Sequence, residues 1–141
     1  MPGKRPSEIV SYNMSQIRSQ GTQLEAKLEE ILKSLPYKYS KHPDVYGKPD
    51  FAFPEAKIVV FADSDFWHGF DWAKKKMELK TNKEFWLKKI ERNIARDAEV
   101  TNHLEEDGWK VIRLWGHDIL KKPDECKALL EKTMKAKEQV N

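Results

Sequence analysis

The apolar run IVVFA at residues 58–62, bounded by Lys57 and Asp63, is the feature that most constrains how this chain can fold. A short continuous apolar run between charged residues is typical of a strand buried at the centre of a sheet. Helices are expected to flank such a sheet, because its apolar faces must be packed away from water. No apolar run approaches the roughly 20 residues that cross a membrane, so we expect no membrane segment.

Two other segments have the apolar periodicity of amphipathic helices. Residues 21–35 place leucine and isoleucine at helical spacing, with Thr22 positioned to cap the helix and Pro36 to end it. Residues 123–140 form a closing amphipathic helix of the same kind. Both helices are long enough to cover part of a small sheet.

The middle of the chain is expected to contain the remaining strands and one long helix. Residues 37–53 give an extended piece, a Pro/Gly turn and a short strand, and residues 109–116 give a third apolar strand. A capping box of Thr81 and Glu84 and a stop at Gly108 predict one long helix, preceded by a lysine-rich loop. The order α-β-β-β-α-β-α predicts an α/β fold with a small mixed central sheet flanked by helices.

Composition narrows the class of protein further. The 141 residues suit one domain, and we expect residues 1–20 to form an N-terminal arm and 21–141 the domain. With 35% charged and 39% hydrophobic residues and no apolar signal-peptide core, the chain is expected to be cytoplasmic. The only cysteine, Cys126, excludes an intrachain disulfide and a cysteine-cluster zinc site.

Asp50 and His68 flank the central strand and are candidates for chemistry. A carboxylate after a Pro turn can hold a hard cation such as Mg²⁺, although "PD" alone more often marks an ordinary turn. A histidine near a metal-bound phosphate can move a proton at neutral pH, although a lone histidine is more often structural. Glu25 is explained by a capping box, and Asp97 by the charged surface of the long helix.

Five motifs resemble, in order and spacing, the very-short-patch-repair mismatch endonucleases, a branch of the restriction-endonuclease-like superfamily. The resemblance covers residues 13–115 and rests on NMSQIRSQGTQLE, GKPDF, VVFADSDFWH, EFWLKKIERNIARD and LEEDGWKVIRLW. It implies a restriction-endonuclease-like nuclease domain and an Mg²⁺-dependent single-strand nick in double-stranded DNA, next to a mispaired or distorted base. It also assigns Asp50 to the metal and His68 to the attacking water, and it makes Glu25 and Asp97 further acidic site residues.

Two departures from the family pattern affect the metal sites. The family holds a structural zinc around and after FWH, where this chain has Asp65, Gly69, Phe70 and Asp71, so zinc is expected to be absent. Ala62 stands where the family often has threonine, and it can offer the metal only its backbone carbonyl. Asp63 next to it either compensates as a ligand or only ends the strand.

The expected DNA contacts fall into two classes. Phosphate contacts are assigned to basic residues that read no bases, namely Lys74, Lys75, Lys76, Lys88, Lys89 and Arg92. The resemblance matches Phe66, Trp67 and Trp86 to side chains that wedge into the base stack, although Trp86 on a helix face would ordinarily be core. Three alternatives stay open: a homing or restriction endonuclease of a mobile element, a non-catalytic DNA-binding domain of this fold, and a protein-interaction domain.

Overall fold

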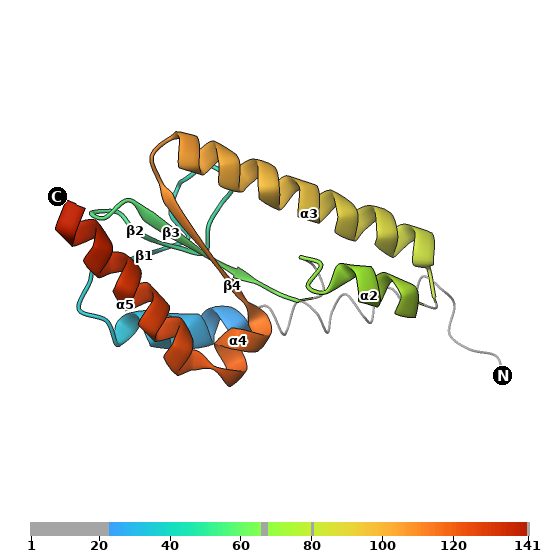
Figure 1. The fold of residues 1–141 in the computed structure, drawn as a ribbon, viewed down its shortest axis with the longest axis horizontal. Coiled ribbons are helices and arrows are strands. Elements are labelled where there is room, and N and C mark those ends of the chain that lie inside the picture. Colours follow the sequence, from blue (N-terminus) through green and yellow to red (C-terminus); the bar gives the residue numbers. More distant parts are fainter. Residues whose placement is uncertain (1–22, 66–67, 80, 141) are drawn as a thin grey trace.

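A mixed four-stranded sheet in the order β1-β2-β3-β4 forms the centre of the structure (Figure 1). The structure is a computed structural model that describes residues 23–65, 68–79 and 81–140, so the predicted arm of residues 1–20 lies outside the described part. After a helix over residues 23–33, the elements in chain order are β1 Ser40–Lys41, β2 Phe51–Phe53, β3 Ile58–Asp63, α2 Trp72–Glu78, α3 Lys83–Glu106, β4 Lys110–Trp115, α4 Gly116–Lys121 and α5 Pro123–Val140.

The central strand is β3, as its apolar run predicts. It pairs antiparallel with β2 on one side and parallel with β4 on the other. The antiparallel pair needs only a short turn, whereas the parallel pair needs a crossover, which α2 and α3 supply. Every residue of β3 except Ala62 is buried, so the predicted α/β fold with a small mixed sheet flanked by helices is confirmed.

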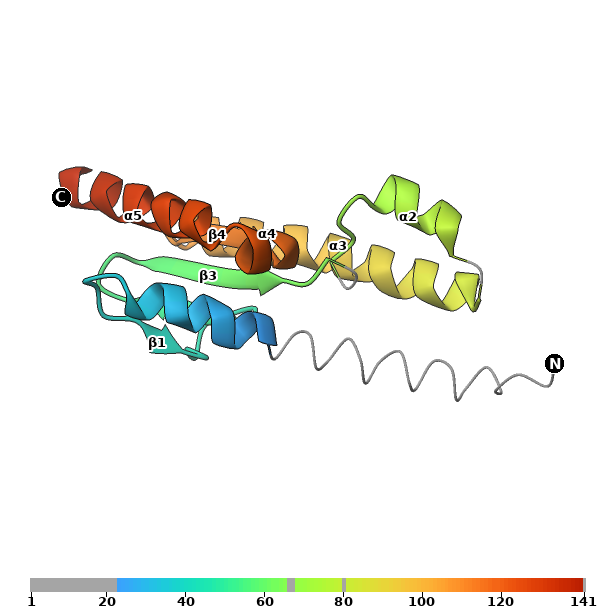
Figure 2. The same cartoon turned by 90° about the horizontal axis from the view of Figure 1, so that it is seen from below.

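Each face of the sheet has its own apolar core. On one face, Ile58 and Val60 pack with Leu28 of the first helix and Leu130 of α5. On the other face, residues including Val59, Phe61, Val100 and Leu104 bring the C-terminal half of α3 onto the sheet. Figures 1 and 2 show that the N-terminal half of α3, with α2 beside it, extends past the end of the sheet.

Two details of the helix predictions are wrong. The lysine-rich segment forms the helix α2 instead of a loop, because Ala, Lys, Met and Glu are all good helix formers. The N-cap of α3 is Asn82 and not Thr81; Asn82 is left-handed with φ 53° and makes no side-chain capping hydrogen bond. The predicted stop is confirmed, since Gly108 follows the C-cap at φ 91°.

Among the described residues, no helix is both long and apolar enough to cross a membrane.

Candidate active site

Asp50 lies just before β2, and the strand register carries it to the end of β3. Phe51 pairs with Val60, so the residue before Phe51 lies beside the last residues of β3. The Ala62 N–H donates a hydrogen bond of 2.7 Å to Oδ2 of Asp50, and the Asp50 N–H donates to the Val60 carbonyl at 3.1 Å. The carboxylate is therefore held in place by backbone groups of the central strand.

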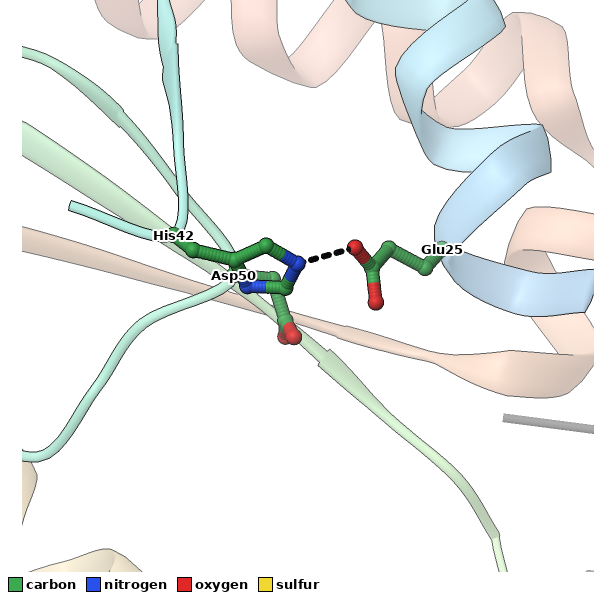
Figure 3. Close-up of side chains that lie close together, drawn as sticks. All are labelled: Glu25, His42 and Asp50. Carbon is green, nitrogen blue, oxygen red and sulfur yellow. Dashed lines mark ion pairs between the residues drawn. The ribbon is translucent and has the colours of Figure 1, made fainter. Parts of the chain in front are cut away.

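Glu25 and His42 approach Asp50 from two other elements, and we call these three residues the first group. Each offers one ligand atom, and the three atoms lie within 4.8 Å of one another. Glu25 comes from the first helix and His42 directly follows β1. Nε2 of His42 is 2.6 Å from Oε1 of Glu25, and Figure 3 shows the ring directed at that carboxylate, beside Asp50.

The electrostatics of the first group suit a cation. Burial raises the pKa of Asp50, and the neighbouring carboxylates of Glu25 and Asp63 raise it further, against the Ala62 hydrogen bond and His42. A positive charge between these oxygens would offset that repulsion. Two carboxylates and an imidazole form a donor set that fits a divalent cation.

His68, Asp97 and Asp63 form a second group on the other side of the same strand end. Nδ1 of His68 lies 2.5 Å from Oδ2 of Asp97 and 3.7 Å from Oδ1 of Asp63. Burial opposes protonation of the ring, but the Asp97 hydrogen bond and the charges of both carboxylates outweigh it and raise the pKa of His68. With Nδ1 engaged by Asp97, the ring can present Nε2 to a water molecule.

Arg113 of β4 compensates the charge of the second group. Its Nη1 donates to both carboxylate oxygens of Asp63 at 3.1 and 3.2 Å. Its Nη2 donates to the Asp97 carbonyl at 3.2 Å, and Nε donates to Oγ1 of Thr101 at 2.8 Å. Asp63 is only 4% exposed; burial raises its pKa, while His68 and Arg113 act in the opposite direction. Because Arg113 already supplies a positive charge here, the second group is less suited to a metal than the first.

A cleft of about 320 Å³ is lined by Asp50 of the first group and by all three residues of the second group, whereas Glu25 and His42 do not line it. The exposed basic residues Lys48 and Arg96 also line it. Lys48, Arg96, His42 and Arg113 are not among the site residues expected from the sequence. Of the four, only Arg113 has a recognisable signal, as a charge inside an apolar strand.

The expected DNA contacts lie around the projecting end of α3. Lys74, Lys75 and Lys76 are in α2, and Lys88, Lys89 and Arg92 are in α3. Trp72 at the start of α2 donates a hydrogen bond of 3.1 Å from Nε1 to Glu91 of α3, which joins the two helices.

The aromatic wedge residues are only partly visible. Phe66 and Trp67 lie outside the described residues. Trp86 is 4% exposed, as a core residue would be, whereas its neighbour Phe85 is 47% exposed. Burial favours the core interpretation of Trp86, and its wedge role stays a prediction that requires the side chain to become exposed.

Side chains join the segment after β3 to the start of α4. Asp65 accepts hydrogen bonds from the backbone N–H of His117 at 3.3 Å and approaches its Nδ1 at 3.0 Å. The ring of Phe70 lies 4.4 Å from that of His117. Cys126 is buried in the core on the α5 side of the sheet. The absence of a structural zinc stays a prediction.

Comparison with known proteins identifies the family. The family model described as DNA mismatch endonuclease Vsr matches residues 6–74. A type II nicking enzyme of Neisseria meningitidis serogroup C is 42% identical over 126 residues, covering 89% of this chain and 85% of that relative. A type II nicking enzyme of Haemophilus parainfluenzae is 39% identical, covering 83% of this chain and 84% of the relative.

A third relative carries the family name itself. The DNA mismatch endonuclease Vsr of Escherichia coli strain K12 is 34% identical over 107 residues, which cover 74% of this chain and 67% of that protein. These matches show the family, and the mixed sheet, the flanking helices and the acidic cleft described above are consistent with it. The chain therefore belongs to the Vsr family and is a DNA endonuclease.

Proposed function

We propose that this endonuclease hydrolyses one phosphodiester bond of duplex DNA beside a mismatched or distorted base pair, with Mg²⁺ as the cofactor. The observation that carries the proposal is the cleft that is lined both by Asp50 and by the paired His68 and Asp97. A phosphate in this cleft would lie between a candidate metal ligand and a candidate base.

The cation would be held by the first group. Asp50 is the central ligand, and Glu25 and the backbone carbonyl of Ala62 are the nearby oxygen donors of the proposed site. The bound cation would polarise a phosphoryl oxygen and lower the pKa of a bound water. Asp63 is better explained as the partner of Arg113 than as a further ligand, because its carboxylate oxygens face the guanidinium group.

His68 is proposed to orient or deprotonate the attacking water. Asp97 accepts the hydrogen bond from Nδ1, so it fixes the ring and leaves the other nitrogen for the nucleophile. Arg113 binds the Asp97 carbonyl and the Asp63 carboxylate and so supports this pair from behind. Asp97 and Asp63 on Nδ1, with Arg113 behind them, would leave Nε2 as the atom that takes the proton from the water.

The substrate is proposed from charge and from the relatives. Lys48 and Arg96 at the cleft and the lysines of α2 are suited to phosphate contacts, which fix the register without reading bases. Two relatives are named nicking enzymes and a third a mismatch endonuclease. These names favour a single-strand nick, and Phe66 and Trp67 are the proposed wedge at the mismatch.

The test is cleavage of labelled duplexes that each contain one mismatch, with a perfect duplex as control. Reactions are run with Mg²⁺ or with EDTA and analysed on denaturing and native gels. We expect a Mg²⁺-dependent cut in one strand of a mismatched duplex, visible only on the denaturing gel. Equal cleavage of the perfect duplex would contradict the proposed specificity for a mismatch. DNA binding without cleavage would indicate a non-catalytic domain of this fold.

A further inference from the structure

His117, the second residue of α4, contacts the chain on both sides of His68 but does not itself line the cleft. We propose that the hydrogen bond from His117 to Asp65 holds His68 in place for proton transfer, which makes His117 a positioning residue for cleavage. The inference rests on the proposed function, because it takes His68 as the residue that acts on the attacking water. It adds a group outside the cleft on which the rate of cleavage depends.

His68 lies in the connection from β3 to α2. We call residues 64–71, of which the structure describes all but 66 and 67, the His68 segment. The Phe70 N–H donates a hydrogen bond of 2.9 Å to the carbonyl of Asp65, and the His68 N–H donates to the carbonyl of Ser64 at 3.1 Å. The backbone on the two sides of His68 is thus joined, so a shift of Asp65 or Phe70 also moves His68.

The side chain of His117 contacts both of these joined residues. Its Nδ1 lies 3.0 Å from Oδ2 and 3.2 Å from Oδ1 of Asp65, and it is the donor because a carboxylate only accepts. Its ring centroid lies 4.4 Å from that of Phe70, and its Nε2 lies 3.3 Å from Oδ1 of Asp118. The side chains of His117 and Asp65 are 31% and 27% exposed, so their hydrogen bond is partly sheltered from water, which strengthens it.

Helix α3 holds the His68 segment from another direction. Gly69 has a φ of 74°, and a Cβ there would lie 2.4 Å from Cδ1 of Ile94, so the backbone of the segment packs directly against α3. Nδ1 of His68 pairs with Asp97 of the same helix. Because α3 and α4 belong to the cores on opposite faces of the sheet, His117 fixes the segment where α3 does not reach.

A competing explanation is that His117 only stabilises the fold. The two explanations differ in how they depend on His68. A positioning residue acts through His68, so its loss has no further effect on the rate once the His68 imidazole has been removed. A general loss of stability does not depend on His68 and is reproduced by destabilising α4 at another residue.

The test separates the hydrogen bond of His117 from its ring contact. His117→Phe keeps a ring against Phe70 but loses the donor, whereas His117→Asn loses the ring but places an amide N–H donor where Nδ1 was. The matched control is Ile119→Val, which weakens the core at a buried residue of the same helix. Urea unfolding compares the stability of the three variants.

Three measurements are made on the full chain. The first is the single-turnover rate constant for cleavage of a mismatched duplex at saturating Mg²⁺, for each variant alone and combined with His68→Ala. The second is affinity for the same duplex in EDTA, followed by fluorescence anisotropy. The third is hydrogen exchange of the Phe70 amide, followed by nuclear magnetic resonance without DNA, which reports opening of the His68 segment whether or not DNA is cut.

We expect His117→Phe to slow cleavage by on the order of tenfold or more, because a displacement of about 1 Å can cost about 10²-fold. Its DNA affinity should equal that of wild type, and its Phe70 amide should exchange faster. His117→Asn and Ile119→Val should remain close to wild type in all three measurements. His117→Phe combined with His68→Ala should be no slower than His68→Ala alone.

Three results would overturn the inference: a wild-type rate in His117→Phe, an equal loss in His117→Asn, or effects of His117→Phe and His68→Ala that multiply. Failure of the proposed function gives a different result. His68→Ala would then cut at the wild-type rate, while exchange of the Phe70 amide would still respond to His117→Phe.

Discussion

Asp50 illustrates, at the scale of a single residue, how a proposed metal ligand can oppose stability. Burial and the nearby carboxylates raise its pKa above 3.8, so the ionised form is disfavoured in the folded protein without metal. Its ionisation therefore costs stability at neutral pH, and the cost disappears as the pH falls through the raised pKa toward the unfolded value. This pH dependence should vanish when the carboxylate is removed.

We expect Asp50→Asn to abolish cleavage while leaving most of the DNA affinity, because phosphate contacts come from other residues. In metal-free buffer the variant should be more stable than wild type at pH 7, and the difference should shrink toward pH 4. Urea unfolding at several pH values and a gel cleavage assay check both effects. Cleavage at the wild-type rate would show that Asp50 is not a metal ligand.

His68 and Asp97 should behave as one unit. His68→Ala should slow turnover by roughly 10²-fold or more, the usual effect of losing a general acid or base. Asp97→Asn should also slow turnover, because the uncharged amide is a weaker acceptor for the Nδ1 hydrogen bond and no longer fixes the ring tautomer. Residues that act together are not additive, so the double variant should be no slower than His68→Ala.

The measurement is the single-turnover rate constant for cleavage, at saturating metal, for the two single variants and the double variant. Multiplied effects in the double variant would mean that Asp97 acts independently of His68.

The sequence alone provides candidates for a chemical role where residue type and position both indicate one. Asp50 after a Pro turn and His68 after a central strand could be singled out as candidates. Glu25 could be explained as part of a capping box and Asp97 as a surface charge of the long helix, and only the family resemblance made them site candidates. The roles of His42 and Arg113 could not be predicted, because each meets its partners only when segments distant in the sequence come together in the fold.

At the scale of elements, Arg113 joins three of them. It lies in β4, pairs with Asp63 of β3 and binds both Asp97 and Thr101 of α3. Removing one partner of a buried ion pair leaves the other charge uncompensated, which typically costs about 3 to 5 kcal/mol. Arg113 is partly exposed, with 21% of its side-chain surface accessible, so we expect the lower end of that range.

The prediction is that Arg113→Ala lowers the free energy of unfolding by about 3 kcal/mol, measured by urea denaturation. The matched control is the double variant Arg113→Met with Asp63→Leu, which removes both charges and should be more stable than Arg113→Ala. If the single variant unfolds like wild type, the pair does not hold the two strands and α3 together.

The helices and strands that have strong local sequence signals could be predicted, and those without such signals could not. The strand of residues 58–62 and the helix ending at Gly108 have strong local signals, an apolar run and a left-handed stop, and both are present. The segment that forms α2 was expected to be a loop, since its lysines suggested solvent exposure and little apolar periodicity. Its helical state follows from propensity and from contact with α3 through Trp72.

At the scale of the whole molecule, basic residues lie on both sides of the sheet. The net charge is only +3, yet the basic residues of α2 project with the N-terminal half of α3 beyond the sheet, and α5 covers the opposite face (Figures 1 and 2). If DNA binds on the α2 side, only lysines on that side release counterions when it binds. Position, and not the number of charges, should decide which lysines matter.

We therefore expect Lys74→Gln, Lys75→Gln and Lys76→Gln, combined in one variant, to weaken DNA binding and flatten its dependence on salt. Each phosphate contact contributes about 0.9 to the slope of log affinity against log salt, so the slope should fall by up to roughly 3. The matched control carries Lys132→Gln and Lys135→Gln, exposed lysines of α5. Fluorescence anisotropy with a labelled duplex at several salt concentrations measures both slopes. A control that loses as much slope per lysine as the α2 variant would place the DNA elsewhere or make binding diffuse. A selective loss in the α2 variant, with cleavage restored at saturating protein, would assign these lysines to phosphate contact and leave the chemistry to the cleft.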